Sequence, residues 1–118
     1  MPYVDGYVIP VPKKNIPAYR KMAVTAAKVW RDLGALEFRE CVGDDLNTKM
    51  GLPFPKLAKL KPGETVVFSF IVYKSRAQRD SINKKIMKDP RIMKMMQQKM
   101  PFDDKRMSFG GFKVLAEA

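Results

Sequence analysis

The chain has 118 residues, the length of one ordinary domain, and 46% of them are apolar. Its single cysteine, Cys41, excludes an internal disulfide, and the lack of histidine excludes a structural zinc site and a haem held by a proximal histidine. Twenty-three Lys and Arg against twelve Asp and Glu give a formal net charge of +11, which favours anionic partners without indicating a fold.

The first predicted element is a strand over residues 3–11, YVDGYVIPV, because β-branched and aromatic side chains dominate it. Gly6 indicates a bulge or the close approach of another group to the backbone. Pro10 and Pro12 are expected to end the strand, since proline has no backbone N–H to donate to a neighbouring strand.

An amphipathic helix is predicted next, with Asn15 as its N-cap and Pro17 in its first turn. Gly34 is expected to end this helix in a left-handed conformation. Apolar residues recur at three- and four-residue spacing between these signals, as one face of a helix requires. They are Ile16, Tyr19, Met22, Ala23, Ala26, Ala27, Trp30 and Leu33.

Two further strands are predicted, separated by a long connection. Residues 35–42, ALEFRECV, alternate apolar and polar side chains and predict a strand with one buried face. Residues 43–63 show no clear periodicity, and such long loops are often lids or arms. Residues 64–73, ETVVFSFIVY, are almost continuously apolar, which predicts a strand covered on both faces.

The second helical region is predicted in two parts. Ser75 and Gln78 form a capping box, and the helix that follows is expected to run to Lys88. Asp89 and Pro90 have the character of an N-cap and a first helical residue, so a new helix is expected there. Its apolar face is predicted to comprise Ile92, Met93, Met96 and Met100, with Pro101 at its end. These methionines, together with Met87, Met95 and Met107, are expected to serve as adaptable core.

A last strand is predicted over residues 107–115, MSFGGFKVL, with Gly110 and Gly111 where another group approaches or the strand bends. The order β-α-β-β-α-β predicts an α+β fold, a ferredoxin-like sandwich with an antiparallel sheet, as one domain over residues 1–118. Two helices cover one sheet face, and the other face is too apolar for water. We therefore expect a homodimer that pairs these faces into a dimeric α/β barrel.

Several long runs resemble the YbaA-like family of small bacterial proteins, a domain of unknown function among the dimeric α/β barrels. The resemblance extends over nearly the whole chain and implies the fold and the homodimer, but no reaction. The runs are YVDGYVIPVP at 3–12, GALEF with the following REC-VGDD at 39–45, ETVVFSFIVYKSRAQRD at 64–80, DPR at 89–91 and MPFDDKRMSFGGF at 100–112. The wider group includes cofactor-free monooxygenases, haem-degrading enzymes, lactone isomerases and ligand-binding regulators. The haem-using members rely on a histidine that this chain lacks.

Strand alternation predicts a polar group on the barrel side of the sheet, made of Asp5, Tyr7, Arg39, Cys41 and Ser69. Asp5 is a candidate for proton abstraction, Tyr7 for donation to an oxyanion and Arg39 for binding an anionic substrate. The structural alternative is a simple ion pair between Asp5 and Arg39. Catalysis by Cys41 has no histidine base to support it.

The segment before the last strand offers a second candidate. Arg106 is expected either to pair with Asp103 in a tight turn or to clamp an anion at the mouth of the pocket. An acidic group of Glu40, Asp44 and Asp45 matches no metal motif, so no metal or cofactor is expected.

Two classes of function are left open. The leading hypothesis is a pocket for a small anionic or phenolic molecule, used for binding or by a cofactor-independent monooxygenase or isomerase. The alternative is binding of RNA or another polyanion by basic residues, chiefly Lys84, Lys85 and Lys88, for which a solvated basic surface is the simpler interpretation. The first residues lack a signal-peptide pattern and no apolar run approaches ~20 residues, so we expect a cytoplasmic protein without a membrane partner.

Overall fold

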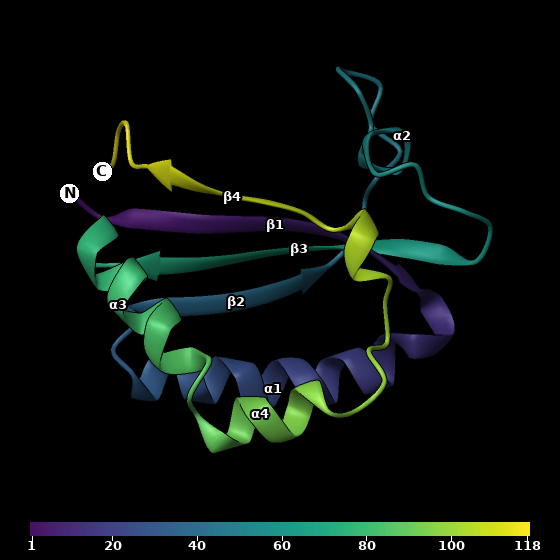
Figure 1. Ribbon diagram of the computed structural model, residues 1–118. Helices are drawn as coiled ribbons and strands as arrows, with labels where there is room; N and C mark the ends of the chain where they lie inside the picture. Colours follow the sequence, from purple (N-terminus) through teal and green to yellow (C-terminus); the bar gives the residue numbers. More distant parts are fainter.

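Four antiparallel strands form one sheet in the order β2-β3-β1-β4. The strands are β1 (Tyr3–Pro12), β2 (Glu37–Val42), β3 (Glu64–Tyr73) and β4 (Ser108–Lys113). They are shown in Figure 1, a computed structural model that describes residues 1–118. With the helices between them, this order is the ferredoxin-like arrangement, so the predicted α+β fold is confirmed.

The three longer helices lie on one face of the sheet (Figure 1). They are α1 (Ile16–Asp32), α3 (Arg76–Ile86) and α4 (Pro90–Met96). One core cluster places Ile71 and Tyr73 of β3 against Ile82 of α3 and Val29 of α1. A second cluster places Ile9 and Val67 against α1. None of the helices combines the length and the apolar character needed to cross a membrane.

β1 ends at Pro12, as predicted, but it continues through Pro10. β1 pairs with β3 as far as Pro12, whereas its pairing with β4 stops at Val8. The Lys13 N–H donates to the Gly63 carbonyl at 2.8 Å, on the β3 side, so by alternation both prolines turn their nitrogens toward the unpaired side. A strand tolerates proline where no neighbour needs its N–H.

The predicted helix starts are confirmed, but one cap differs. Ser75 accepts from the Gln78 N–H at 3.1 Å and Asp89 accepts from the Arg91 N–H at 2.9 Å. Asn15 precedes α1 without capping it, because its amide donates to the Pro101 carbonyl at 3.0 Å instead. Asn15 therefore ties the segment before β4 to the start of α1.

The predicted apolar face of the last helix is partly wrong. Ile92 is buried, but Met93 and Met96 are more than half exposed, and Met95 packs on the core in their place. The helix ends at Met96 and is only seven residues long, so Met100 lies outside it. The buried face follows the three-residue spacing of Ile92 and Met95, and Met93 and Met96 lie one position further round the helix.

Two glycines in the sheet allow close approaches. The register of β1 is unbroken at Gly6, so there is no bulge, and a Cβ there would meet the Phe112 ring at 3.4 Å. At Gly111 the Tyr3 hydroxyl and the Arg79 guanidinium occupy the space that a Cβ would need. The close-approach interpretation of both positions is therefore confirmed.

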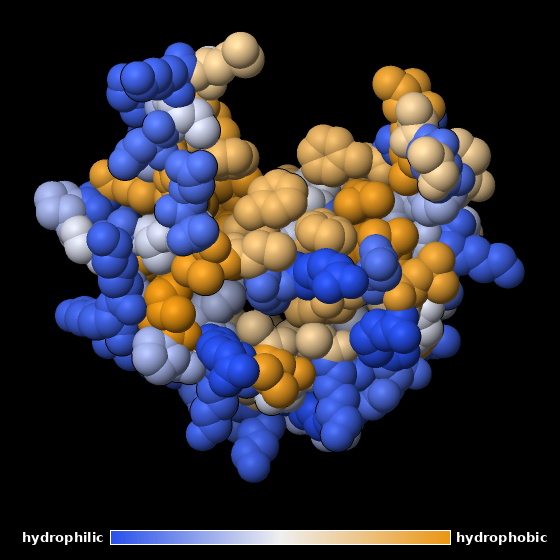
Figure 2. All heavy atoms as spheres, turned by 180° about the vertical axis from the view of Figure 1, so that it is seen from behind, coloured by the Kyte–Doolittle hydropathy of each residue, from blue (hydrophilic) through white to orange (hydrophobic).

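The sheet face opposite the helices, here called the open face, has no cover. Val4, Val8, Phe68, Phe70 and Phe112 line a hollow of about 470 Å³ on it. Figure 2 shows apolar side chains gathered around this hollow, between two projecting segments. By comparison with Figure 1, these segments are the C-terminal residues and the connection between β2 and β3, which contains the four-residue helix α2 (Phe54–Leu57).

Candidate functional site

The sheet separates the polar residues that were predicted to share one face. Asp5, Tyr7 and Ser69 alternate in phase with Ile9 and Ile71, which pack in the helix-side core, so they face the helices. The predicted parity of β1 and β3 was therefore wrong. Both strands carry apolar residues on both faces, so hydrophobic alternation contains no signal for which face meets the helices.

Arg39 and Cys41 were placed correctly on the other face. β2 turns Phe38, Glu40 and Val42 toward the helices and leaves Arg39 and Cys41 exposed. Arg39 lies 3.9 Å from Glu37, and both side chains are largely exposed. Because Arg39 and Asp5 lie on opposite faces, they form neither the predicted anion site nor the alternative ion pair.

Asp5 belongs to a buried polar row beneath α3. It is only 4% exposed, and its carboxylate lies 3.6 Å from the Nε of Arg79, whose terminal nitrogen donates to the Tyr3 hydroxyl at 3.0 Å. Burial raises the pKa of Asp5, opposed by the charge of Arg79 and by the Tyr73 hydroxyl. Tyr73 in turn accepts from the Trp30 indole at 3.1 Å. These partners join β1, β3, α1 and α3.

Tyr7 and Ser69 are neighbours across β1 and β3. The Tyr7 ring stacks on Phe109 with 5.7 Å between the ring centroids. Burial raises the pKa of Tyr7 to about 12, and the nearby charges of Asp5 and Glu40 add to this effect. Tyr7 therefore keeps its proton at neutral pH, and its hydroxyl can donate or accept a hydrogen bond. Its role as a donor to an oxyanion stays a prediction.

A cleft of about 330 Å³ opens between α1 and β2 on the helix side. Most of its lining is apolar: Ile16, Ala23 and Ala27 from α1, Phe38 and Val42 from β2, and Val67 from β3. The small side chains at Ala23 and Ala27 leave room where α1 would otherwise close on the edge strand. This volume lies in the range of small-molecule sites.

Glu40 is the acidic residue in this cleft, and it accepts a hydrogen bond from the Tyr19 hydroxyl at 2.8 Å. Burial raises the pKa of Glu40, and the hydroxyls of Tyr19 and Ser69 oppose the shift without cancelling it. The pKa of Tyr19 is also raised, by burial and by the Glu40 charge. A buried carboxyl whose pKa is raised in this way is a candidate proton donor or acceptor.

Sequence reasoning missed this role of Glu40. It grouped Glu40 with Asp44 and Asp45, but those two are exposed beyond β2 and no three acidic or cysteine side chains form a cluster. The signal available was the alternation of Phe38, Glu40 and Val42, which places one charged residue on the buried side of an amphipathic strand. Such a residue is a candidate for function.

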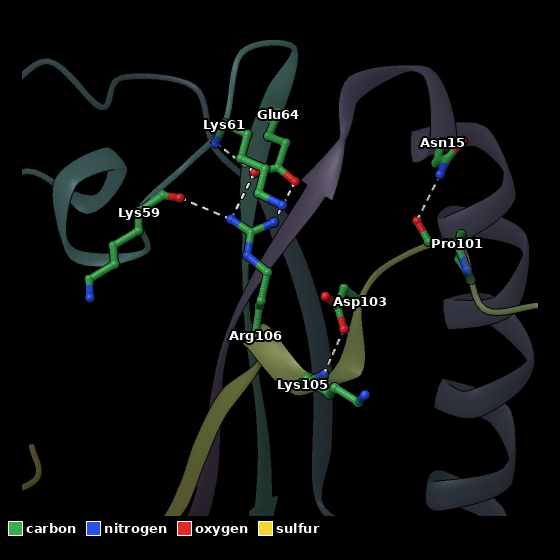
Figure 3. Close-up of polar contacts among 8 residues, drawn as sticks. All are labelled: Asn15, Lys59, Lys61, Glu64, Pro101, Asp103, Lys105 and Arg106. Atoms are coloured by element: carbon green, nitrogen blue, oxygen red, sulfur yellow. Dashed lines mark hydrogen bonds and ion pairs between the residues drawn. The ribbon is translucent and has the colours of Figure 1, made fainter.

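Arg106 has neither of its predicted partners. Its guanidinium donates to both carboxylate oxygens of Glu64, at 2.6 and 2.9 Å, and to the Lys59 carbonyl at 2.9 Å (Figure 3). Asp103 instead accepts from the Lys105 N–H at 3.0 Å. The bidentate contact with a residue 42 positions earlier commits Arg106 to holding the chain together, so it is not free to clamp an anion.

The lysines of the basic surface make no ion pairs within the molecule. Every ion pair in the molecule is made by an arginine, and no lysine lies within 4 Å of a carboxylate. Lys84 and Lys85 are exposed in the last turn of α3, with Lys88 just beyond. A groove of about 410 Å³ between α1 and the end of α4 is lined by Lys21, Lys94 and Lys99 among others.

Comparison with known proteins agrees with this architecture. The chain resembles the solved structure of Rv0793 from Mycobacterium tuberculosis, with a TM-score of 0.62, 15% identity and coverage of 100% of this chain and 99% of that one. A dimeric ferredoxin-like protein from an uncultured marine organism has a TM-score of 0.55 at 15% identity, with 100% of both chains covered. These likenesses show a ferredoxin-like α+β protein.

Sequence comparison shows the family. Residues 2–104 match the model of a family described as a protein of unknown function, DUF1428. The uncharacterized protein YbaA of Escherichia coli K12 is 44% identical over 117 residues, 99% of each chain, and YbaA of Shigella flexneri matches equally well. The chain belongs to the DUF1428 family, and the resemblance read from its motifs is confirmed.

Proposed function

We propose that the protein is a homodimer that binds a small, mainly apolar molecule with one hydroxyl group, such as a phenol, in the cleft between α1 and β2. The observation that carries this proposal is the Glu40 carboxyl, which lies in an apolar cleft, hydrogen-bonded to Tyr19. An apolar wall with one placed polar group is the usual composition of a small-molecule site.

Of the two ligand classes expected from the sequence, the phenolic one suits this cleft better. An anion would meet the Glu40 carboxyl and would find Arg20 as the only cation among the lining residues. A phenol hydroxyl can donate to Glu40 while its ring contacts the alanines of α1. The same carboxyl is suited to take the phenol proton, the first step that a cofactor-free monooxygenase or an isomerase requires.

Self-association is the second part of the proposal. The open face presents Phe68, Phe70 and Phe112 to solvent, and a solved structural neighbour is described as dimeric. An apolar surface of this kind is usually an interface. A second copy laid face to face would close the two sheets into a dimeric α/β barrel and leave both α1–β2 clefts on the outside.

The ligand proposal is tested with a matched pair of probes, 4-ethylphenol and ethylbenzene, which differ by one hydroxyl. Binding is followed by nuclear magnetic resonance through the backbone amides of residues 36–42. A net hydrogen bond of about 0.5–1.5 kcal/mol predicts that 4-ethylphenol binds about two- to tenfold tighter. Equal affinities, or shifts that occur elsewhere in the protein, would contradict the proposal.

Two variants and a control locate the site. Glu40→Leu should abolish the preference for 4-ethylphenol while ethylbenzene still binds. Ala27→Leu should fill the cleft and weaken both probes. Glu37→Leu is the matched control, because Glu37 lies on the same strand but on the opposite face, and it should leave the preference unchanged.

A second candidate function is binding of a polyanion, favoured by the unpaired lysines. The probe is a fluorescent 12-nucleotide poly(U) RNA, whose affinity should fall steeply with salt if lysines release counterions from phosphates. Changing Lys84, Lys85 and Lys88 to Gln tests the α3 end, and changing Lys21, Lys94 and Lys99 to Gln tests the α1–α4 groove. This function is rejected if neither triple variant reduces the affinity.

A further inference from the structure

The connection between β2 and β3 (residues 43–63, here called the arm) carries apolar side chains that its own protomer does not cover. Met50 is 90% exposed, Leu52 is 65% exposed and Leu57 is 54% exposed. Leaving large apolar side chains in water is unfavourable. Their concentration in one projecting segment therefore indicates a surface that another molecule covers.

The arm is nevertheless held in a defined position at its base (Figure 3). Arg106 donates to Glu64 and to the Lys59 carbonyl, and the Lys61 N–H donates to Glu64 at 2.7 Å. Lys59 has a φ of +52°, a left-handed conformation that is uncommon for a residue with a side chain. The carbonyl of the same residue accepts a hydrogen bond from Arg106. This contact of Arg106 with Lys59 and Glu64, here called the latch, therefore holds the arm in this conformation.

The arm also contacts the open face directly. The Phe54 ring of α2 meets the Phe68 ring of β3 edge to face, with 6.4 Å between the ring centroids. Phe68 lines the hollow of the open face, and Phe54 lies on the helix of the arm. The arm therefore stands beside the hollow, as Figure 2 shows, and not over the α1–β2 cleft on the helix side.

We infer that the arm of each protomer clasps its partner in the dimer, where the partner covers Met50, Leu52 and Leu57. This inference rests on the homodimer proposed above. A second copy is the occupant that fits, because one chain supplies both an apolar projection and an apolar hollow. In a dimer with a two-fold axis between the paired open faces, the arm of each copy makes the same contact with the other copy. An arm that stands on the open side of its own sheet reaches across that interface.

The test compares Leu52→Ser with Met87→Ser in the full chain by sedimentation equilibrium. Leu52 and Met87 are similarly exposed, at 65% and 61%, but Met87 follows α3 on the helix side. Because each substitution occurs twice in a symmetric dimer, Leu52→Ser should raise the dimer dissociation constant at least about tenfold. Met87→Ser should leave the constant unchanged.

A second variant tests the latch without touching the apolar tip. Arg106→Gln should weaken the dimer in the same direction and increase hydrogen exchange of the amides of residues 50–57. Thermal unfolding of each variant shows that the fold itself is intact. The inference is supported when both the arm tip and the latch matter and Met87 does not.

Two results overturn the inference and are distinguishable from each other. If Leu52→Ser dimerises as tightly as the wild type, the arm does not clasp the partner, but the homodimer proposal stands. If the wild-type chain is monomeric at every accessible concentration, both the clasp and the homodimer are rejected. Equal exchange rates of the arm amides in wild type and in Arg106→Gln would show that Arg106 does not hold the arm.

Discussion

Phe112 and Phe109 offer a paired test of which sheet face forms the dimer. They lie three residues apart on β4, and strand alternation places them on opposite faces. Phe112 covers Gly6 on the open face, whereas the Phe109 ring stacks on Tyr7 on the helix side, and Phe109 borders the hollow only at the edge strand β4. Both are more than half exposed, so either could be taken for an interface residue from its exposure alone.

The magnitude follows from the exposed fraction of Phe112, which is 59%. Full burial of such a side chain is favourable by about 1.5–3 kcal/mol, so covering the exposed part gives about 1–2 kcal/mol per protomer. The substitution Phe112→Ser loses this twice in a symmetric dimer, or about 2–4 kcal/mol. The dimer dissociation constant should therefore rise by roughly 30-fold or more.

The assay is sedimentation equilibrium of wild type, Phe112→Ser and Phe109→Ser over a range of concentrations. Phe109→Ser should leave the dissociation constant within about twofold of wild type. Equal effects of the two substitutions, or an effect of Phe109→Ser alone, would refute the face-to-face assignment.

Four further predictions concern stability, each measured by urea unfolding. Burial raises the folded-state pKa of Glu40, so the ionised carboxylate lowers the stability of the fold above that pKa. Glu40→Gln should therefore be more stable than wild type at pH 7. This gain should shrink as the pH falls through the pKa of Glu40. The pKa of Glu64 is lowered, chiefly by the Arg106 hydrogen bond, so Glu64→Gln should be less stable than wild type at pH 7. This loss of stability should shrink in acid. If Glu40→Gln and Glu64→Gln change the stability at pH 7 in the same direction, the two assignments are contradicted. Ile82→Ala, which empties a site that is 1% exposed in the core, should lower the free energy of unfolding by about 2–5 kcal/mol, and a loss below about 1 kcal/mol would place Ile82 outside the core. Ser75→Ala removes the cap of α3 and should cost about 1 kcal/mol, with no loss expected only if the cap is not formed.

The order of helices and strands was predictable because each element has a local signal. The apolar stripe from Ile16 to Leu33 occurs at a helical period, and Asp89-Pro90 marks a new helix start whatever surrounds it. These signals depend on residues a few positions apart. The fold followed from their order, since few arrangements accommodate β-α-β-β-α-β.

The candidate site was less predictable, because it depends on which face of each strand meets the helices. β1 and β3 are apolar on both sides, so Asp5 and Ser69 were placed on the wrong face. Arg106 was given a neighbour in the sequence when its partner, Glu64, lies 42 residues away. The cleft around Glu40 arises from the packing of α1 on β2, and no local sequence pattern indicates how closely these two elements pack.

We propose Glu40 as the functional carboxyl of the α1–β2 cleft. The pKa of its side chain can be followed through the carboxyl carbon by nuclear magnetic resonance, with and without 4-ethylphenol. We expect a pKa above the ordinary glutamate value of about 4.3, and a further change when the phenol binds. An ordinary pKa that does not respond to the phenol would contradict the proposal.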